Sequence, residues 1–257
     1  MKIEHEDQII TDFLKSVGVW RDHIVISGGY ALFIYKLYLA DHGLKNPPIG
    51  TRDIDSILPR RNPINPAKDL LKHLRDAGYT PIFKNRDIPA AESYVKKFRG
   101  VEIEIEFFTD TAVRHDKNKN VLIAGVVAQP LSYLSLSLTS SIKFQTYTKE
   151  IGRVVSPGAW IFHKGLTFTK RKTSSKRLKD LYGIWYVASQ LGAFSEHAIT
   201  EYASHAQQHS KWFTTLQNNL LGWLENASPL EWSQLETQDP SGQLKKLHFE
   251  KTLTKLI

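Results

Sequence analysis

The sequence predicts an α+β protein, in which a mixed β-sheet flanked by helices is followed by a mainly helical C-terminal domain. Apolar and acidic residues alternate strictly over 101–107, as in a strand with one buried face. An apolar run ends in two glycines at 28–29 and continues into a helical pattern, and helical spacing dominates after Trp160. A chain of 257 residues can bury a substantial core. We therefore expect one domain over 1–155 and a helical domain over 156–257.

The first domain is predicted to start with an amphipathic helix and then to alternate between strands and helices. Apolar residues recur at helical spacing within 4–16, and Gly18 ends that pattern. Short apolar or alternating runs between turn residues indicate strands. On these signals we predict helices over 4–16, 30–40 and 67–77, and strands over 24–26, around Asp53 and Asp55, over 79–83 and over 101–107.

More strands are predicted before the helical domain begins. A polar loop over 110–120 is followed by apolar or alternating segments, which we interpret as strands over 121–127, 134–138 and within 142–155. Pro157 stands where a helix would start, because proline suits the first turn. The helical pattern then continues to the end of the chain, with interruptions at 226–229 and 239–242.

Composition limits the possible functions. The chain has no cysteine, which excludes disulfides, a thiolate nucleophile and a zinc–thiolate site. A formal charge of +8 and a pI near 9.4 favour polyanionic partners, although a mildly basic soluble enzyme explains the net charge equally well. No segment approaches the roughly 18 apolar residues of a membrane span, and the N-terminus lacks the apolar core of a signal peptide. We expect a cytoplasmic protein with no membrane partner.

Two short motifs point to phosphate and metal chemistry. Gly28 and Gly29 allow a sharp turn and a close approach to phosphate, and the N–H groups of the following helix attract anions. Asp53 and Asp55 are two residues apart in a predicted strand, so their carboxylates share one face. Paired carboxylates are suited to hard divalent cations.

The alternating strand offers a third carboxylate. Its glutamates share the face opposite the apolar residues, and they are Glu102, Glu104 and Glu106. The alternative is that all three form the hydrated face of an edge strand.

The order of these motifs resembles the nucleotidyltransferase superfamily. The resemblance lies in apolar-Gly-Gly-x-Ala-Leu, which ends at Leu32, followed by Thr-x-Asp-Ile-Asp over 51–55. Segments over 131–134, 155–171 and 176–182 are similar to a branch related to the AbiE-type toxins of bacterial toxin–antitoxin systems. The resemblance runs from about residue 20 to about residue 190 and implies a nucleotidyltransferase-type sheet.

The resemblance also implies roles for single residues of the sheet domain. Asp53 and Asp55 would bind Mg²⁺ or Mn²⁺, and a third metal ligand would come from the alternating strand. Glu106 matches the family pattern best and Glu104 is the second choice, with glutamate replacing the usual aspartate. The phosphates of a nucleoside triphosphate would lie against Gly28, Gly29 and Thr51.

Two residues of the helical domain are implicated by the same resemblance. Lys164 would contact the triphosphate, and Asp180 would orient it or bind the acceptor. The alternatives are a solvated helix lysine at 164 and a surface ion pair between Asp180 and Lys176. Basic residues without an intervening acid extend over 164–179, which favours a nucleic-acid acceptor on a helix face.

The function predicted on this basis is metal-dependent transfer of a nucleoside monophosphate from a nucleoside triphosphate to an acceptor hydroxyl. The acceptor is expected to be RNA, as in a toxin with a cognate antitoxin. Two alternatives stay open: a weakly active or inactive protein that binds nucleotide or RNA, and a small-molecule enzyme of the aminoglycoside-modifying kind. The basic segment over 164–179 argues against the latter, because a cationic drug prefers an acidic site.

Overall fold

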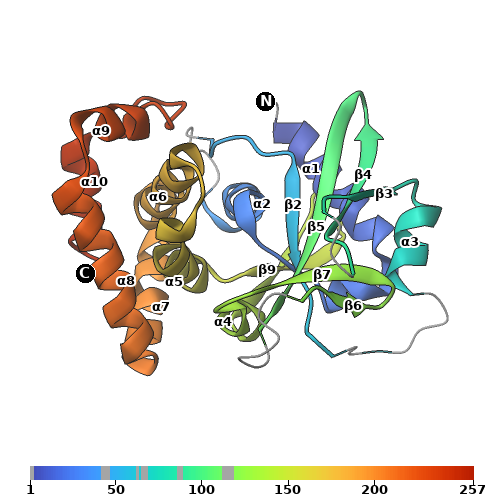
Figure 1. The fold of residues 1–257 in the computed structure, drawn as a ribbon. Helices are drawn as coiled ribbons and strands as arrows, with labels where there is room; N and C mark the ends of the chain where they lie inside the picture. The colour runs from blue at the N-terminus through green and yellow to red at the C-terminus, as the bar shows by residue number, and fades with distance from the viewer. Residues whose placement is uncertain (1–2, 42–46, 62–63, 65–68, 86–88, 112–118) are drawn as a thin grey trace. The chain divides into compact units, whose positions relative to one another are not determined.

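A computed structural model describes residues 3–41, 47–61, 64, 69–85, 89–111 and 119–257 (Figure 1). The chain forms two compact units, of which the sheet unit comprises Met1–Ile34 and Gly50–Val155. The helical unit comprises Tyr35–Ile49 and Ser156–Ile257. The start of the helix predicted over 67–77 and most of the polar loop predicted over 110–120 lie outside the described residues.

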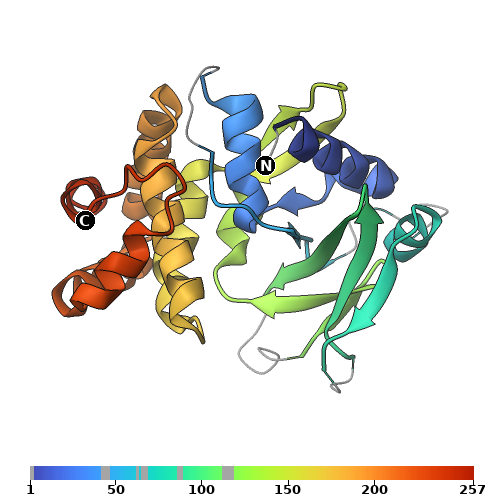
Figure 2. The same ribbon diagram turned by 90° about the horizontal axis from the view of Figure 1, so that it is seen from above.

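The described strands of the sheet unit form one nine-stranded mixed sheet, with β3-β4-β5-β2-β1-β9-β8 as its main order (Figure 2). Strand β2 runs parallel to β5, and β9 runs parallel to β1, whereas the other neighbours on that path are antiparallel. Strand β7 pairs with β5 and with β6. The strands are β1 Val25–Ile26, β2 Asp53–Ile57, β3 Thr80–Phe83, β4 Glu92–Phe98, β5 Val101–Asp110, β6 Val121–Ile123, β7 Val126–Leu131, β8 Ser141–Gln145 and β9 Ile151–Val155.

The sheet unit also contains four α-helices among its described residues, as the sequence predicts. Helix α1 is joined to β4 by an ion pair between Asp12 and Lys96, whose charged atoms are 2.8 Å apart. Asp69 caps α3 by accepting a hydrogen bond from the Lys72 backbone N–H at 2.7 Å. The helices of this unit are α1 Ile3–Ser16, the 3₁₀ turn Gly18–Asp22, α2 Gly28–Ile34, α3 Leu70–Asp76 and α4 Leu134–Thr139. The mixed sheet flanked by helices confirms the predicted fold class.

Two details of the predicted sheet are wrong. The segment predicted as a strand over 134–138 is helix α4, whose first N–H is bound by the Asp110 carboxylate at 3.1 Å. Alternate leucines also place Leu134 and Leu138 on one helical face, so the short pattern fits either structure. The strand predicted over 121–127 is a hairpin of β6 and β7, whose turn at Ala124 and Gly125 has positive φ at both residues.

The helical unit continues to the end of the chain, which confirms the mainly helical C-terminal region. The rings of Trp223, Trp232 and Phe249 pack edge to face with centroids 4.7–5.7 Å apart and join three helices. The helices after residue 155 are α5 Pro157–Thr167, the 3₁₀ turn Phe168–Lys170, α6 Ser174–Ser189, α7 Ala193–Gln208, α8 Ser210–Asn226, α9 Pro229–Glu236 and α10 Lys246–Leu253. In the described part of the chain, no helix is long and apolar enough to cross a membrane.

A buried ion network joins α5 to α6. Asp180 is 6% exposed and accepts from the Lys164 ammonium at 2.8 Å and from the Arg171 Nε at 2.5 Å. Burial alone raises the pKa of the Asp180 carboxyl, but the charges of Lys164 and Arg171 outweigh burial and hold that pKa below its usual value. Because the folded-state pKa is lowered, the stabilisation is present above about pH 4 and is lost as the pH falls further.

Asp180→Asn is predicted to lower the free energy of unfolding at pH 7 by about 3–5 kcal/mol, because it leaves the Lys164 ammonium buried without its counter-charge. The difference in melting temperature between wild type and variant should shrink as the pH falls below about 4, where the wild-type carboxylate becomes protonated. Thermal unfolding followed by circular dichroism at a series of pH values measures both effects.

Glu250→Gln is the matched control, because Glu250 pairs with Lys246 on the exposed surface of α10. Its removal should change the melting temperature little at any pH. Equal losses in the two variants would show that the Asp180 network does not stabilise the helical unit.

Candidate active site

The pairing of β2 with β5 brings four carboxylates together on one face of the sheet. The register places Asp53 beside Glu104 and Asp55 beside Glu106. Laterally paired residues point to the same side of a sheet, so the four side chains share one face. Ile54 and Ile105 are buried on the opposite face. We call Asp53, Asp55, Glu104 and Glu106 the acidic block.

The glycine motif lies directly against this block. Gly28 has a φ of +59°, and a Cβ added to it would lie 1.8 Å from the Asp55 Oδ2. The Ser27 N–H donates to the Asp55 backbone carbonyl at 2.8 Å, which fixes the turn before α2. A Cβ on Gly29 would lie 2.7 Å from the Thr51 Cγ2. The turn therefore needs glycine at position 28, whereas a side chain at position 29 would have to displace Thr51, and the two sequence motifs are neighbours in space.

Lys84 is a site residue that the sequence analysis missed. Its ammonium forms ion pairs with Glu104 and with Glu106, the latter at 2.7 Å. Burial tends to raise the pKa of the Glu104 carboxyl, but the contact with the Lys84 ammonium lowers it below its usual value. The pairing of β3 with β4 and of β4 with β5 would have revealed Lys84, but β4 was not predicted.

The acidic block is chemically suited to a divalent cation, because hard cations prefer carboxylate oxygens. Asp53, Asp55 and Glu106 contribute from adjacent strands to the same face. Within the described residues, no three His, Cys, Asp or Glu side chains are grouped closely enough to hold a metal ion. Glu106 is bonded to Lys84 instead, so a three-carboxylate site requires Glu106 to exchange that partner.

The edge-strand interpretation of the glutamates is wrong. Strand β5 lies inside the sheet, with β2 along one side and β4 and β7 along the other. Glu102, the first of the three glutamates of β5, is exposed and pairs in register with Lys97 of β4 rather than with a residue of β2. Only the two later glutamates therefore stand beside the aspartates.

Lys164 and Asp180 belong to the helical unit, where they contact each other. Both are buried, at 7% and 6% exposure, so the alternatives of a solvated lysine and of a surface pair with Lys176 are wrong. The basic segment over 164–179 is also not one helix face. It includes the end of α5, a 3₁₀ turn and the start of α6, and its Arg177 is paired with Glu231 at 3.0 Å.

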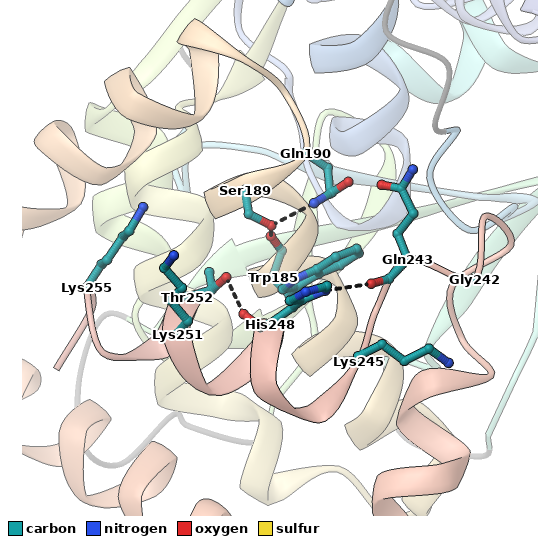
Figure 3. Close-up of a pocket in the computed structure, with 10 residues that line it drawn as sticks. All are labelled: Trp185, Ser189, Gln190, Gly242, Gln243, Lys245, His248, Lys251, Thr252 and Lys255. Atoms are coloured by element: carbon teal, nitrogen blue, oxygen red, sulfur yellow. Dashed lines mark hydrogen bonds between the residues drawn. The ribbon is translucent and has the colours of Figure 1, made fainter.

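A second basic surface lies in the helical unit and was not predicted. A cavity of about 520 Å³ between α6 and α10 has Trp185 in its lining, and His248, Lys251 and Lys255 contribute from α10 and the turn after it (Figure 3). The His248 Nδ1 lies 3.1 Å from the Gln243 carbonyl oxygen, which fixes the imidazole ring. The lining residues are Trp185, Ser189, Gln190, Gly242, Gln243, Lys245, His248, Lys251, Thr252 and Lys255, with no acid among them.

A family model identifies the family to which the chain belongs. A family model described as nucleotidyltransferase matches residues 6–208. The solved structure of an antigenic nucleotidyltransferase-like protein from Paracoccidioides brasiliensis is similar, with a TM-score of 0.42 and 14% identity over 83% of this chain and 93% of that chain. A search among curated proteins finds no match. The family match includes the glycine motif, the acidic block and the Lys164–Asp180 pair, and the chain belongs to the nucleotidyltransferase family.

Proposed function

We propose that this protein transfers a nucleoside monophosphate from a nucleoside triphosphate to an acceptor hydroxyl with the help of a divalent cation. The observation that carries the proposal is the contact between the two motifs, in which the glycine turn at Gly28 packs on the Asp55 carboxylate. Phosphate-binding backbone groups and metal-binding carboxylates are thereby adjacent, as nucleotidyl transfer requires. Membership of the nucleotidyltransferase family supports the same reaction in general.

The chain's own residues would divide the work as follows. Asp53, Asp55 and Glu106 would hold Mg²⁺ or Mn²⁺, which when bound offsets negative charge on the reacting phosphate and on the pyrophosphate leaving group. Gly28 and Gly29 would hold the terminal phosphates through their N–H groups, with Thr51 beside them. Glu106 would also accept the proton of the attacking hydroxyl. Most of the catalysis in such a site comes from position and electrostatics.

Lys164 and Asp180 enter the proposal as a pair. The family resemblance assigns to Lys164 a contact with the triphosphate. It assigns to Asp180 either the orientation of Lys164 or a contact with the acceptor. The ion pair between them supports the part of this assignment in which Asp180 positions the lysine. The nucleotide affinity and the melting temperature of Lys164→Met separate the two roles. Weaker nucleotide binding at an unchanged melting temperature supports a role in nucleotide binding, and a lower melting temperature alone supports a role in folding.

A second candidate function is nucleotide or RNA binding without efficient transfer. The observation in its favour is the ion pair of Lys84 with Glu104 and Glu106, which occupies the third carboxylate. Incubation of the protein with each labelled nucleoside triphosphate, Mg²⁺ and total RNA decides between the two functions. A labelled product supports transfer, and nucleotide binding without product supports the second candidate.

We propose RNA as the acceptor and a toxin-like role with a cognate antitoxin. The sequence resemblance to the AbiE-related branch supports the role, and the exposed lysines at 172 and 176 support the acceptor. Lys172, two residues before α6, and Lys176, in the first turn of α6, are both exposed, and no acid lies between them. A surface of this kind attracts the phosphates of a single strand.

Asp53→Asn and Asp55→Asn should each reduce nucleotidyl transfer by about a hundredfold or more, because each removes the negative charge of a carboxylate that would contact the proposed cation. Neither variant should unfold, since the loss of one of four neighbouring like charges relieves repulsion in the absence of metal. Transfer rates and melting temperatures are the measurements. Asp76→Asn, on the surface of α3, serves as the matched control, and wild-type activity in either site variant would refute the assignment.

Glu106→Gln should impair transfer more than Glu104→Gln, and Glu102→Gln should have almost no effect. The reason is the register, which pairs Glu106 with Asp55, whereas Glu102 lies outside the acidic block. Initial rates at saturating nucleoside triphosphate and Mg²⁺ test the ranking. A larger loss in Glu104→Gln would make Glu104 the third ligand.

Reversal of Lys172 and Lys176 to glutamate should weaken RNA binding and flatten its salt dependence. Each lost phosphate contact changes the log–log slope by roughly 0.7 for a single strand. Arg171 and Arg177 are left unchanged, because both are held in ion pairs that support the helical unit.

The control for the charge reversal is Lys143→Glu combined with Lys211→Glu, which changes the net charge equally at exposed sites on β8 and α8. Filter binding between about 50 and 200 mM salt measures affinity and slope. If both double variants lose RNA to the same extent, net charge rather than this surface determines binding. Undetectable wild-type binding at the lowest salt would argue against an RNA acceptor.

A further inference from the structure

Lys84 reaches the acidic block through the pairing of β3 with β4 and of β4 with β5. On β4, Ser93 pairs with Glu106, and on β3, Ile82 pairs with Ser93. Strand side chains alternate, so Lys84, two residues after Ile82, points to the same face. The Lys84 N–H donates to the Ala91 carbonyl at 2.7 Å, which continues the β3–β4 ladder to this residue. The position of the lysine is therefore fixed by strand pairing.

Negatively charged side chains are crowded in the acidic block. The four carboxylates of the acidic block stand side by side on two adjacent strands, and like charges at this separation repel. Lys84 is ion-paired with the two glutamates. Its side chain is 38% exposed, so it can move into solvent without leaving a buried gap. The ammonium thus offsets part of the charge and is held only at the surface.

We propose that Lys84 is a built-in counter-ion that competes with the divalent cation for Glu106. In the metal-free protein the Lys84 ammonium forms ion pairs with Glu104 and Glu106. Cation binding breaks these pairs and releases the Lys84 side chain to solvent, still protonated. Lys84 thereby sets the metal concentration at which the three-carboxylate site assembles. This inference rests on the proposed function for the identity of the site.

The test is a titration of the full chain with Mn²⁺ alone, in which free Mn²⁺ is followed by electron paramagnetic resonance. Lys84→Met should bind Mn²⁺ about tenfold more tightly than wild type, because the competing ion pair and a nearby positive charge are both removed. Lys97→Met is the matched control. It removes an equal charge from neighbouring β4, opposite Glu102, and should leave Mn²⁺ affinity unchanged.

A double variant locates the competition. Lys84→Met in a Glu106→Gln background should gain little Mn²⁺ affinity, because the contested ligand is absent. Lys84→Gln is a second charge-removing variant, and circular dichroism checks that each variant is folded. The proposal is overturned if Lys84→Met and Lys84→Gln bind Mn²⁺ no better than wild type, if Lys97→Met gains equally, or if the gain persists without Glu106. Absence of Mn²⁺ binding in every variant also overturns it.

A separate transfer assay distinguishes failure of this inference from failure of the proposed function. Tighter Mn²⁺ binding by Lys84→Met without any nucleotidyl transfer in wild type supports the counter-ion and refutes the function. Transfer by wild type with unchanged Mn²⁺ binding by Lys84→Met supports the function and refutes the counter-ion. Weaker nucleotide binding with unchanged Mn²⁺ affinity would make Lys84 a phosphate ligand and would overturn the proposal.

Discussion

The parallel pairing of β2 with β5 is the constraint on which the candidate site depends. A slip of one residue would turn Asp53 and Asp55 toward the buried face and would expose Ile54. Ile54 and Ile105 are at most 1% exposed, so such a slip would lose apolar burial and bury two charges at once. The apolar face of the sheet therefore holds the register, and the register in turn brings the two pairs of carboxylates together. Apolar packing on one face of the sheet therefore positions the carboxylates of the candidate site on the other face.

Much of the sheet could be predicted because its information is local. The alternation over 101–107 and the two glycines that begin α2 each determine a nearby backbone conformation, and the structure agrees with both. Lys84 could not be found in this way, because its place follows from two successive strand pairings, both of which involve the unpredicted β4. The error over 134–138 has a different origin. Five residues are too few to separate the two periods, and the Asp110 cap, which favours the helix, is 24 residues away.

The helical unit shows how burial can reverse the meaning of a charge. Lysine and aspartate at the two ends of a basic segment can be taken for residues of a solvated surface. The chain instead folds Lys164 and Asp180 into a buried pair, with Arg171 completing the set of donors. Desolvation of these ions is costly, and it is tolerated because each charge has a bonded partner. Sequence resemblance selected the two positions, but only the packed helices show that they act on each other.

The tight fit between Gly28 and Asp55 bears on how the protein can change over generations. While Asp55 is present, any side chain at position 28 collides with its carboxylate, so the glycine is under steric selection. A lineage that lost Asp55 to a smaller residue would release that restriction, leaving only the milder preference of a positive φ for glycine. Substitutions could then accumulate at position 28. Restoring the aspartate would no longer suffice, because the new side chain would fill its space. Loss of the Asp55 carboxylate would thus be hard to reverse, and inactive relatives would be recognisable by replacements at both position 28 and position 55.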